Sequence, residues 1–135
     1  MSEKINIENI EKIVTHWIES SDEDFKSMCS MLESKHYDWA LFVGHLAIEK
    51  LLKGLYVKKH HKHAPFIHDL LRLAALNNLD VTEEQEEWLD EITSFNLNTR
   101  YVDSKKQFYF KCTPEFATQW ANKIKNLRIW LKTKF

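Results

Sequence analysis

The chain has 135 residues, a length typical of one domain, and we expect a single domain over residues 1–135. It contains only 2 glycines and 2 prolines, so its elements must be few and long, which favours an all-helical protein over a sheet protein with many tight turns. A net charge of -1 argues against a generally basic nucleic-acid-binding protein but leaves room for a local basic patch.

The sequence predicts a soluble cytoplasmic protein. The N-terminus, MSEKINIENIEKIV, is charged every few residues and lacks the apolar stretch of a signal peptide. No segment approaches the roughly 18 uninterrupted apolar residues of a membrane span. Cys29 and Cys112 lie far apart without a metal-type spacing, so we interpret them as reduced packing residues.

The first helical pattern covers residues 5–18 and continues over residues 25–32. Its apolar positions recur at helical spacing, namely Ile10, Val14, Trp17, Ile18, Phe25, Met28, Cys29 and Leu32. The polar run ESSDEDF interrupts the pattern, and there Ser21 and Asp24 are placed as a capping pair that would start a new helix. The pattern is therefore compatible with one helix or with two.

Residues 37–59 carry the strongest signal and predict a central helix of about six turns. A broad apolar arc of this helix comprises Ala40, Leu41, Val43, Gly44, Ala47, Ile48, Leu51, Leu52 and Leu55, and a polar stripe on the opposite side comprises His45, Glu49 and Lys53. A helix that is apolar on more than half of its circumference usually packs against two layers, one of which could be a second subunit. This arc, together with the five tryptophans of the chain, predicts a homodimer.

The rest of the chain predicts one short helix and two long ones. The short helix lies in residues 67–78, with His68 and Asp69 at its start, and His68 is placed to hydrogen-bond across the bundle. Residues 81–100 follow with Thr82 as N-cap, and the last helix begins at Pro114 after the cap Thr113. The apolar stripes of these two helices are Trp88, Leu89, Ile92 and Phe95, and Phe116, Trp120, Ile124, Leu127 and Leu131. The predicted fold is all-α, an up-and-down bundle of four long helices plus one short helix, with an aromatic connector over residues 98–110.

Two interpretations of the polar stripe stay open. His45, Glu49 and Lys53 follow one another at intervals of four, which suits a ladder of ion pairs and hydrogen bonds along one helix face. The same face suits a phosphate-bearing ligand, with Lys53 binding its charge and Glu49 orienting a neighbouring group. The spacing does not choose between the two.

The sequence offers no catalytic, metal or cofactor motif. The histidines of HHKH, residues 60–63, lack helical metal-ligand spacing and are typical of a solvated helix end. Phosphate-loop, nucleophile-elbow, zinc-helix and C-x-x-C motifs do not occur. We therefore expect no metal and no cofactor, and we identify no catalytic residue.

Three separated signatures occur in order: YDWALFVGHLAIEKLLKGLYV, IHDLLRLA and NTRYVD. In this the chain resembles the HEPN domain family over about residues 15–132, although Val102 stands where the family usually has proline after RY. The resemblance implies a helical bundle that dimerises and places two copies of a conserved arginine, here Arg100, around a shared cleft. It also implies pairing with a minimal nucleotidyltransferase in a toxin–antitoxin-like system.

In the ribonucleases of that family the arginine belongs to an R-x(4-6)-H motif, whose arginine stabilises the scissile phosphate and whose histidine transfers protons without a metal. Here Lys105, Lys106 and Gln107 occupy the histidine positions, and these residue types are not ordinary general bases at neutral pH. The related R-x4-H-x-Y pattern, whose tyrosine is adenylylated by the partner, would place Tyr109 at the tyrosine if two extra residues are allowed.

These observations lead to one main functional hypothesis and two alternatives. The main hypothesis is a homodimeric HEPN-domain protein that binds a nucleotide or RNA phosphate and acts with a nucleotidyltransferase. Its ligand-binding residues would be Arg100, Lys53, Glu49, His45, Tyr101 and Tyr109. The alternatives are a degenerate metal-independent ribonuclease toxin and a purely structural interaction module, and an ion pair between Arg100 and an acidic residue such as Glu49 is the competing role for that arginine.

Overall fold

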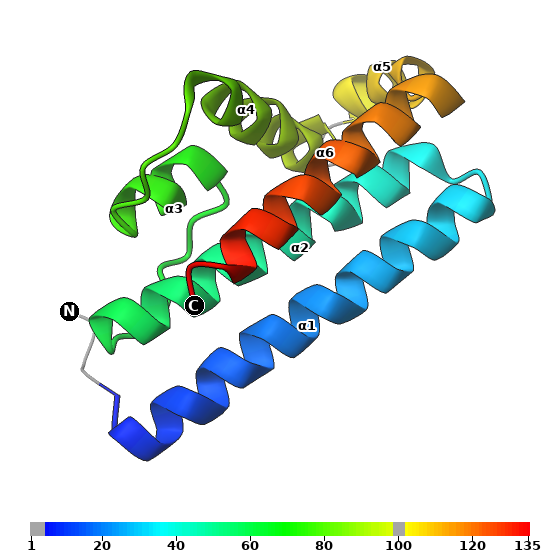
Figure 1. The fold of residues 1–135 in the computed structure, drawn as a ribbon. Coiled ribbons are helices and arrows are strands. Elements are labelled where there is room, and N and C mark those ends of the chain that lie inside the picture. The colour runs from blue at the N-terminus through cyan, green and yellow to red at the C-terminus, as the bar shows by residue number, and fades with distance from the viewer. Residues whose placement is uncertain (1–4, 99–101) are drawn as a thin grey trace.

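The computed structural model describes residues 5–98 and 102–135, and these residues form six helices (Figure 1). The long helices are α1 (Ile7–Glu33), α2 (Tyr37–His60), α4 (Glu83–Asn98) and α6 (Pro114–Lys132); the short ones are α3 (Leu70–Leu76) and α5 (Val102–Lys111). The prediction of an all-α bundle with four long helices and a short one is confirmed. No helix in the described part of the chain is long and apolar enough to cross a bilayer.

Helix α1 is one continuous helix of 27 residues. Ser21 is not a cap: its buried hydroxyl donates to the carbonyl of Ala47 in α2 at 2.6 Å. Asp24 binds the ammonium of Lys50, also in α2, at 2.7 Å. The polar run that resembled a helix break is therefore a polar strip along the contact between α1 and α2, and intrahelical hydrogen bonding continues through it.

Helix α2 is the central element and contacts each of the other five described helices. Figure 1 shows α1 running antiparallel along one side of α2, α6 lying along α2, and α3 and α4 lying on the side away from α1. The predicted apolar arc is buried except for the half-buried Val43. Helices of the same chain cover this arc, so its burial does not require a second subunit.

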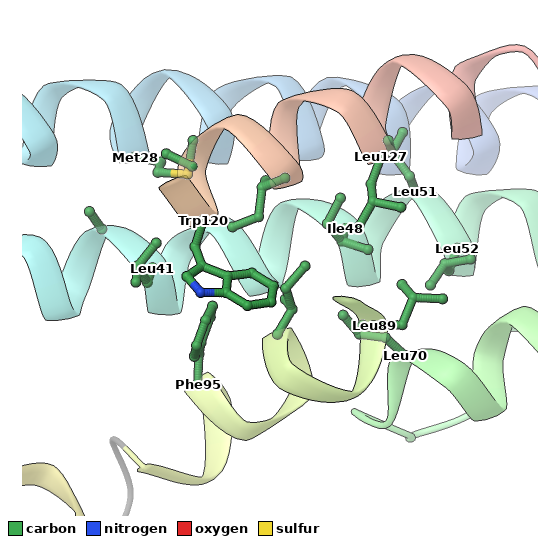
Figure 2. Packing of buried hydrophobic residues seen from close by; sticks show 14 of the residues in the cluster. Met28, Leu41, Ile48, Leu51, Leu52, Leu70, Leu89, Phe95, Trp120 and Leu127 are labelled. Atoms are coloured by element: carbon green, nitrogen blue, oxygen red, sulfur yellow. The ribbon is translucent and has the colours of Figure 1, made fainter. Parts of the chain in front are cut away.

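The core fills the space between α2, α4 and α6. Phe95 of α4 and Trp120 of α6 lie together with nearly perpendicular rings, their centroids 5.7 Å apart (Figure 2). Leu89, Ile92, Ile124 and Leu127 are also buried, as their stripes predict. The caps are confirmed too, because the hydroxyl of Thr82 accepts from the backbone N–H of Gln85 and that of Thr113 from Phe116.

The predicted aromatic connector is partly wrong, because residues 102–111 form helix α5. Phe108 is buried, with its ring centroid 5.4 Å from that of Phe95. Phe110, in contrast, is 69% exposed. Successive helical residues point about 100° apart, so burying Phe108 turns the positions after it away from α4.

The two glycines of α2 stand where neighbouring helices approach closely. A Cβ at Gly54 would lie 2.9 Å from the Cβ of Trp17 in α1, an atom next to the backbone. A Cβ at Gly44 would instead meet the ends of two side chains, Ile124 Cδ1 at 2.6 Å and Met28 Sδ at 2.8 Å. The clash at Gly44 can be relieved by rotation of the Ile124 and Met28 side chains, whereas the clash at Gly54 can be relieved only by movement of α1.

We predict that Gly54→Ala lowers the free energy of unfolding by about 1 to 3 kcal/mol, because overpacking outweighs the gain of about 1 kcal/mol in helix propensity. Gly44→Ala is the matched control and should cost less. Urea unfolding of both variants measures the difference. Equal stability of Gly54→Ala and wild type would show that α1 yields at no cost.

Candidate functional site

The polar stripe of α2 is a buried cluster centred on the carboxylate of Glu49. Oε2 of Glu49 lies 3.2 Å from the ammonium of Lys53, and Oε1 lies 2.8 Å from Nδ1 of His68. Glu49 is only 5% exposed and Lys53 6%. The predicted ladder of polar contacts is therefore present, but it lies in the interior of the bundle, where a charge is tolerated only when it is paired.

His68 reaches this cluster from the segment between α2 and α3, as its predicted cross-bundle hydrogen bond requires. Its side chain is about half exposed, so it connects the buried carboxylate to solvent. Asp69 follows it and caps α3 by accepting from the backbone N–H of Arg72 at 3.2 Å. The backbone N–H of Leu70 then donates to the hydroxyl of Thr93 in α4. Contacts to two helices thus fix the end of this segment.

His45 lies at the inner end of the cluster and is fully buried. Its Nε2 is 3.1 Å from the carbonyl oxygen of His68, which makes Nε2 the protonated nitrogen, and 3.7 Å from Oε1 of Glu49. Its Nδ1 has no hydrogen-bond partner among the described residues. Burial lowers the pKa of His45 below its ordinary value of 6.5, so the imidazole is neutral near physiological pH.

Lys53 connects this cluster to a groove of about 490 Å³. The groove lies between the N-terminal half of α1 and the segment that follows α2, and its walls are Ile13, His16, Trp17, Lys53, His63, Ala64, Pro65 and Phe66. The ammonium of Lys53 lies 6.0 Å from the centroid of the Trp17 ring, within the range of a cation–π contact. The aromatic residues of this groove, Trp17 and Phe66, are not among the predicted site residues. In the sequence, an aromatic residue directly after Pro65 in a polar segment could have indicated Phe66.

The other predicted ligand-binding residues are not part of this cluster. Tyr109 lies on α5 and is 61% exposed. Helix α5 packs at the start of α2, where Lys105 lies 4.8 Å from the Trp39 ring. Lys53 is about 21 Å further along α2, at 1.5 Å per residue. Tyr109 and Lys53 therefore lie at opposite ends of α2, and Arg100 and Tyr101 lie outside the described residues.

The histidines at the start of HHKH end α2, and the two cysteines differ in burial. His60 ends α2, with Nε2 2.9 Å from the carbonyl oxygen of Leu76, and His61 is a left-handed C-cap with φ 54°. Within residues 5–98 and 102–135, no group of three or more His, Cys, Asp or Glu side chains is arranged so that it could hold a metal ion. Burial raises the pKa of the Cys112 thiol to about 12, which keeps it protonated, whereas Cys29 is exposed and is not the packing residue we predicted.

We predict that the free energy of unfolding falls as the pH drops below about 6.5, by up to about 1.4 kcal/mol per pH unit from His45. The pKa of His45 is lowered in the folded state, so below about pH 6.5 the unfolded chain binds more protons than the folded chain. The stability that neutral His45 contributes is therefore fully present only above this pH. Glu49 and Lys53 of α2 and His68 face this imidazole. In His45→Gln, an amide that does not titrate donates to the same carbonyl, so urea unfolding should show a weaker pH dependence. Parallel profiles for variant and wild type would contradict this.

Comparison with known proteins agrees with this architecture. The crystal structure of TT1696 from Thermus thermophilus superposes with a TM-score of 0.77 at 22% identity, covering 90% of this chain and 98% of that chain. At this identity the likeness concerns the fold alone. No curated protein matches the chain. The family model of the HEPN domain matches residues 14–134, and the chain therefore belongs to the HEPN domain family.

Proposed function

We propose that this HEPN protein is a cytoplasmic homodimer that binds a nucleotide or an RNA phosphate and acts with a nucleotidyltransferase partner in a toxin–antitoxin-like system. The observation that carries the proposal is the position of Lys53, a nearly buried cation at the wall of an open groove with aromatic sides. An anionic ligand with an aromatic part matches both properties of this wall.

The Glu49 cluster supports a role for Lys53 in binding phosphate. An ion pair with Glu49 holds Lys53 in place, and the ammonium carries three donors, so it still has donors for a phosphate oxygen. Oε1 of Glu49 also lies 2.8 Å from Nδ1 of His68, so Lys53 is not the sole partner of this carboxylate. The carboxylate orients the cation and leaves part of its charge to act on the groove.

Arg100 supplies a second phosphate contact in this proposal. Its guanidinium carries five donors, which match phosphate oxygens in pairs.

Exposed apolar side chains near α5 support the homodimer. Leu97 at the end of α4 is 52% exposed, and Tyr109 and Phe110 of α5 form an exposed aromatic pair with ring centroids 5.5 Å apart. Covering such side chains favours association because it removes apolar surface from water. This patch replaces the arc of α2 as the argument for a second copy.

The alternative of a metal-independent ribonuclease gains no support from α5. Lys105, Lys106 and Gln107 are exposed there, and neither residue type is an ordinary general base at neutral pH. An arginine without a proton-transfer group binds phosphate but does not cleave the bond efficiently. Binding without cleavage is accordingly the function that we propose.

We predict that the wild-type chain forms a dimer of twice 16.2 kDa and that Phe110→Glu converts it to a monomer with unchanged helicity. A carboxylate in an apolar contact is costly to desolvate. Ile129→Glu on α6 is the control, since Ile129 is also exposed, at 58%. Light scattering measures the mass. A wild-type mass of 16.2 kDa would contradict the dimer, and a dimeric Phe110→Glu would remove this patch from the interface.

We predict that Arg100→Ala weakens binding of single-stranded RNA or nucleotide by roughly 10- to 150-fold, the value of one charge-assisted phosphate contact of about 1.5 to 3 kcal/mol. Arg72→Ala, at an exposed arginine of α3, is the matched control and should bind like wild type. Calorimetric titration gives the affinities, and circular dichroism checks the fold. Unfolding of Arg100→Ala would instead identify a structural ion pair.

A further inference from the structure

We infer that the groove between α1 and the α2–α3 segment binds a nucleobase, which stacks between Trp17 and Phe66 while its phosphate faces Lys53 and His63. The inference rests on the proposed function and names the ligand class of the same site: a nucleoside phosphate, either a free mononucleotide or an unpaired nucleotide of RNA.

Phe66 is the first observation behind this assignment, because its ring is fully exposed, at 101%. The segment around it is held in place: the backbone N–H of Ile67 donates to the carbonyl of Pro65 at 2.9 Å, which closes a turn with Phe66 at its apex. Ile67 on the next position packs against the core. The neighbours of Phe66 are thus anchored while its own ring projects into solvent, where only a ligand or partner can cover it.

Trp17 is the second aromatic residue in the lining of this groove, and its position is fixed by packing. Its Cβ packs against Gly54 of α2, at a spacing that leaves no room for a side chain there. The rest of the half-buried indole borders the groove. Two aromatic side chains in the lining of one groove are a stacking platform for a planar base, since every base has a π-face.

The size and charge of the groove fit the rest of a nucleotide. A volume of about 490 Å³ falls in the usual range of small-ligand sites. The polar residues of its described lining are His16, Lys53 and His63, and that lining includes no carboxylate residue. Lys58, Lys59 and Lys62 lie in the adjoining sequence. An apolar, aromatic groove with a basic edge favours an aromatic anion over an uncharged or cationic ligand.

The test titrates adenosine 5′-monophosphate, adenosine, ribose 5-phosphate and a short oligoadenylate into wild type, Phe66→Ala, Phe66→Trp and Ile129→Ala by calorimetry. We expect Phe66→Ala to weaken adenosine monophosphate by about 5- to 150-fold, the value of one stacked base. Ribose 5-phosphate, which has no base, should be unaffected. Phe66→Trp should restore affinity, and Ile129→Ala, which removes an exposed apolar side chain on α6, should bind like wild type. Because Phe66 is fully exposed, its replacement should leave the fold intact.

The outcomes separate this inference from the proposed function. Tight binding of oligoadenylate together with weak binding of the mononucleotide identifies RNA as the source of the base, and the reverse identifies a free nucleotide. Either result supports the site when the binding depends on Phe66. Nucleotide or RNA binding that requires Arg100 but not Phe66 overturns the inference and leaves the proposed function standing. No binding by wild type overturns both. Loss of a protein partner in Phe66→Ala, with nucleotide affinity unchanged, makes the groove a protein-docking surface and also overturns the inference.

Discussion

The enclosure of α2 by its own chain is the constraint on which the rest of the structure depends. A helix that contacts five others is buried along most of its middle section, so a polar side chain there must find a partner within the bundle. Glu49 meets this requirement by binding Lys53 one turn later and His68 from another segment. Removing one partner from such a buried pair leaves an uncompensated charge, which costs about 3 to 5 kcal/mol. The cluster is therefore part of the fold before it is part of any site.

Close packing of α1 against α2 links the fold to the groove. Because Gly54 has no side chain, the backbone of α1 can approach α2 closely at Trp17. The indole of Trp17 lines the groove. The same ring lies next to the Lys53 ammonium. A change in the spacing of the two helices would move the aromatic wall and the cation relative to each other, so a packing constraint also sets the geometry of the candidate site.

The sequence predicted well those features that follow from local periodicity and capping. The stripes that end in Phe95 and Leu131 and the caps Thr82 and Thr113 occur where they were expected, because helical spacing and cap chemistry act over a few residues. It missed α5, in which Phe108 is the one buried residue among those whose burial the structure describes, so that no periodic signal arises. It also treated the polar stripe as a separate face, although burial of Glu49 depends on His68, 19 positions away. Long-range partners of this kind do not appear in a helical projection.

The buried carboxylate also determines where Phe66 stands. His68 follows Phe66 by two positions, and it is held twice, by its ring to Glu49 and by its carbonyl to Nε2 of His45. At the other end of the same segment the backbone N–H of His61 binds Val57 and closes α2. A short segment fixed at both ends has little freedom to let Phe66 turn inward, because that motion would break contacts to a buried charge. The ion-pair cluster of α2 and the exposed ring are thus two parts of one arrangement, in which the cluster holds the segment that presents the ring to solvent.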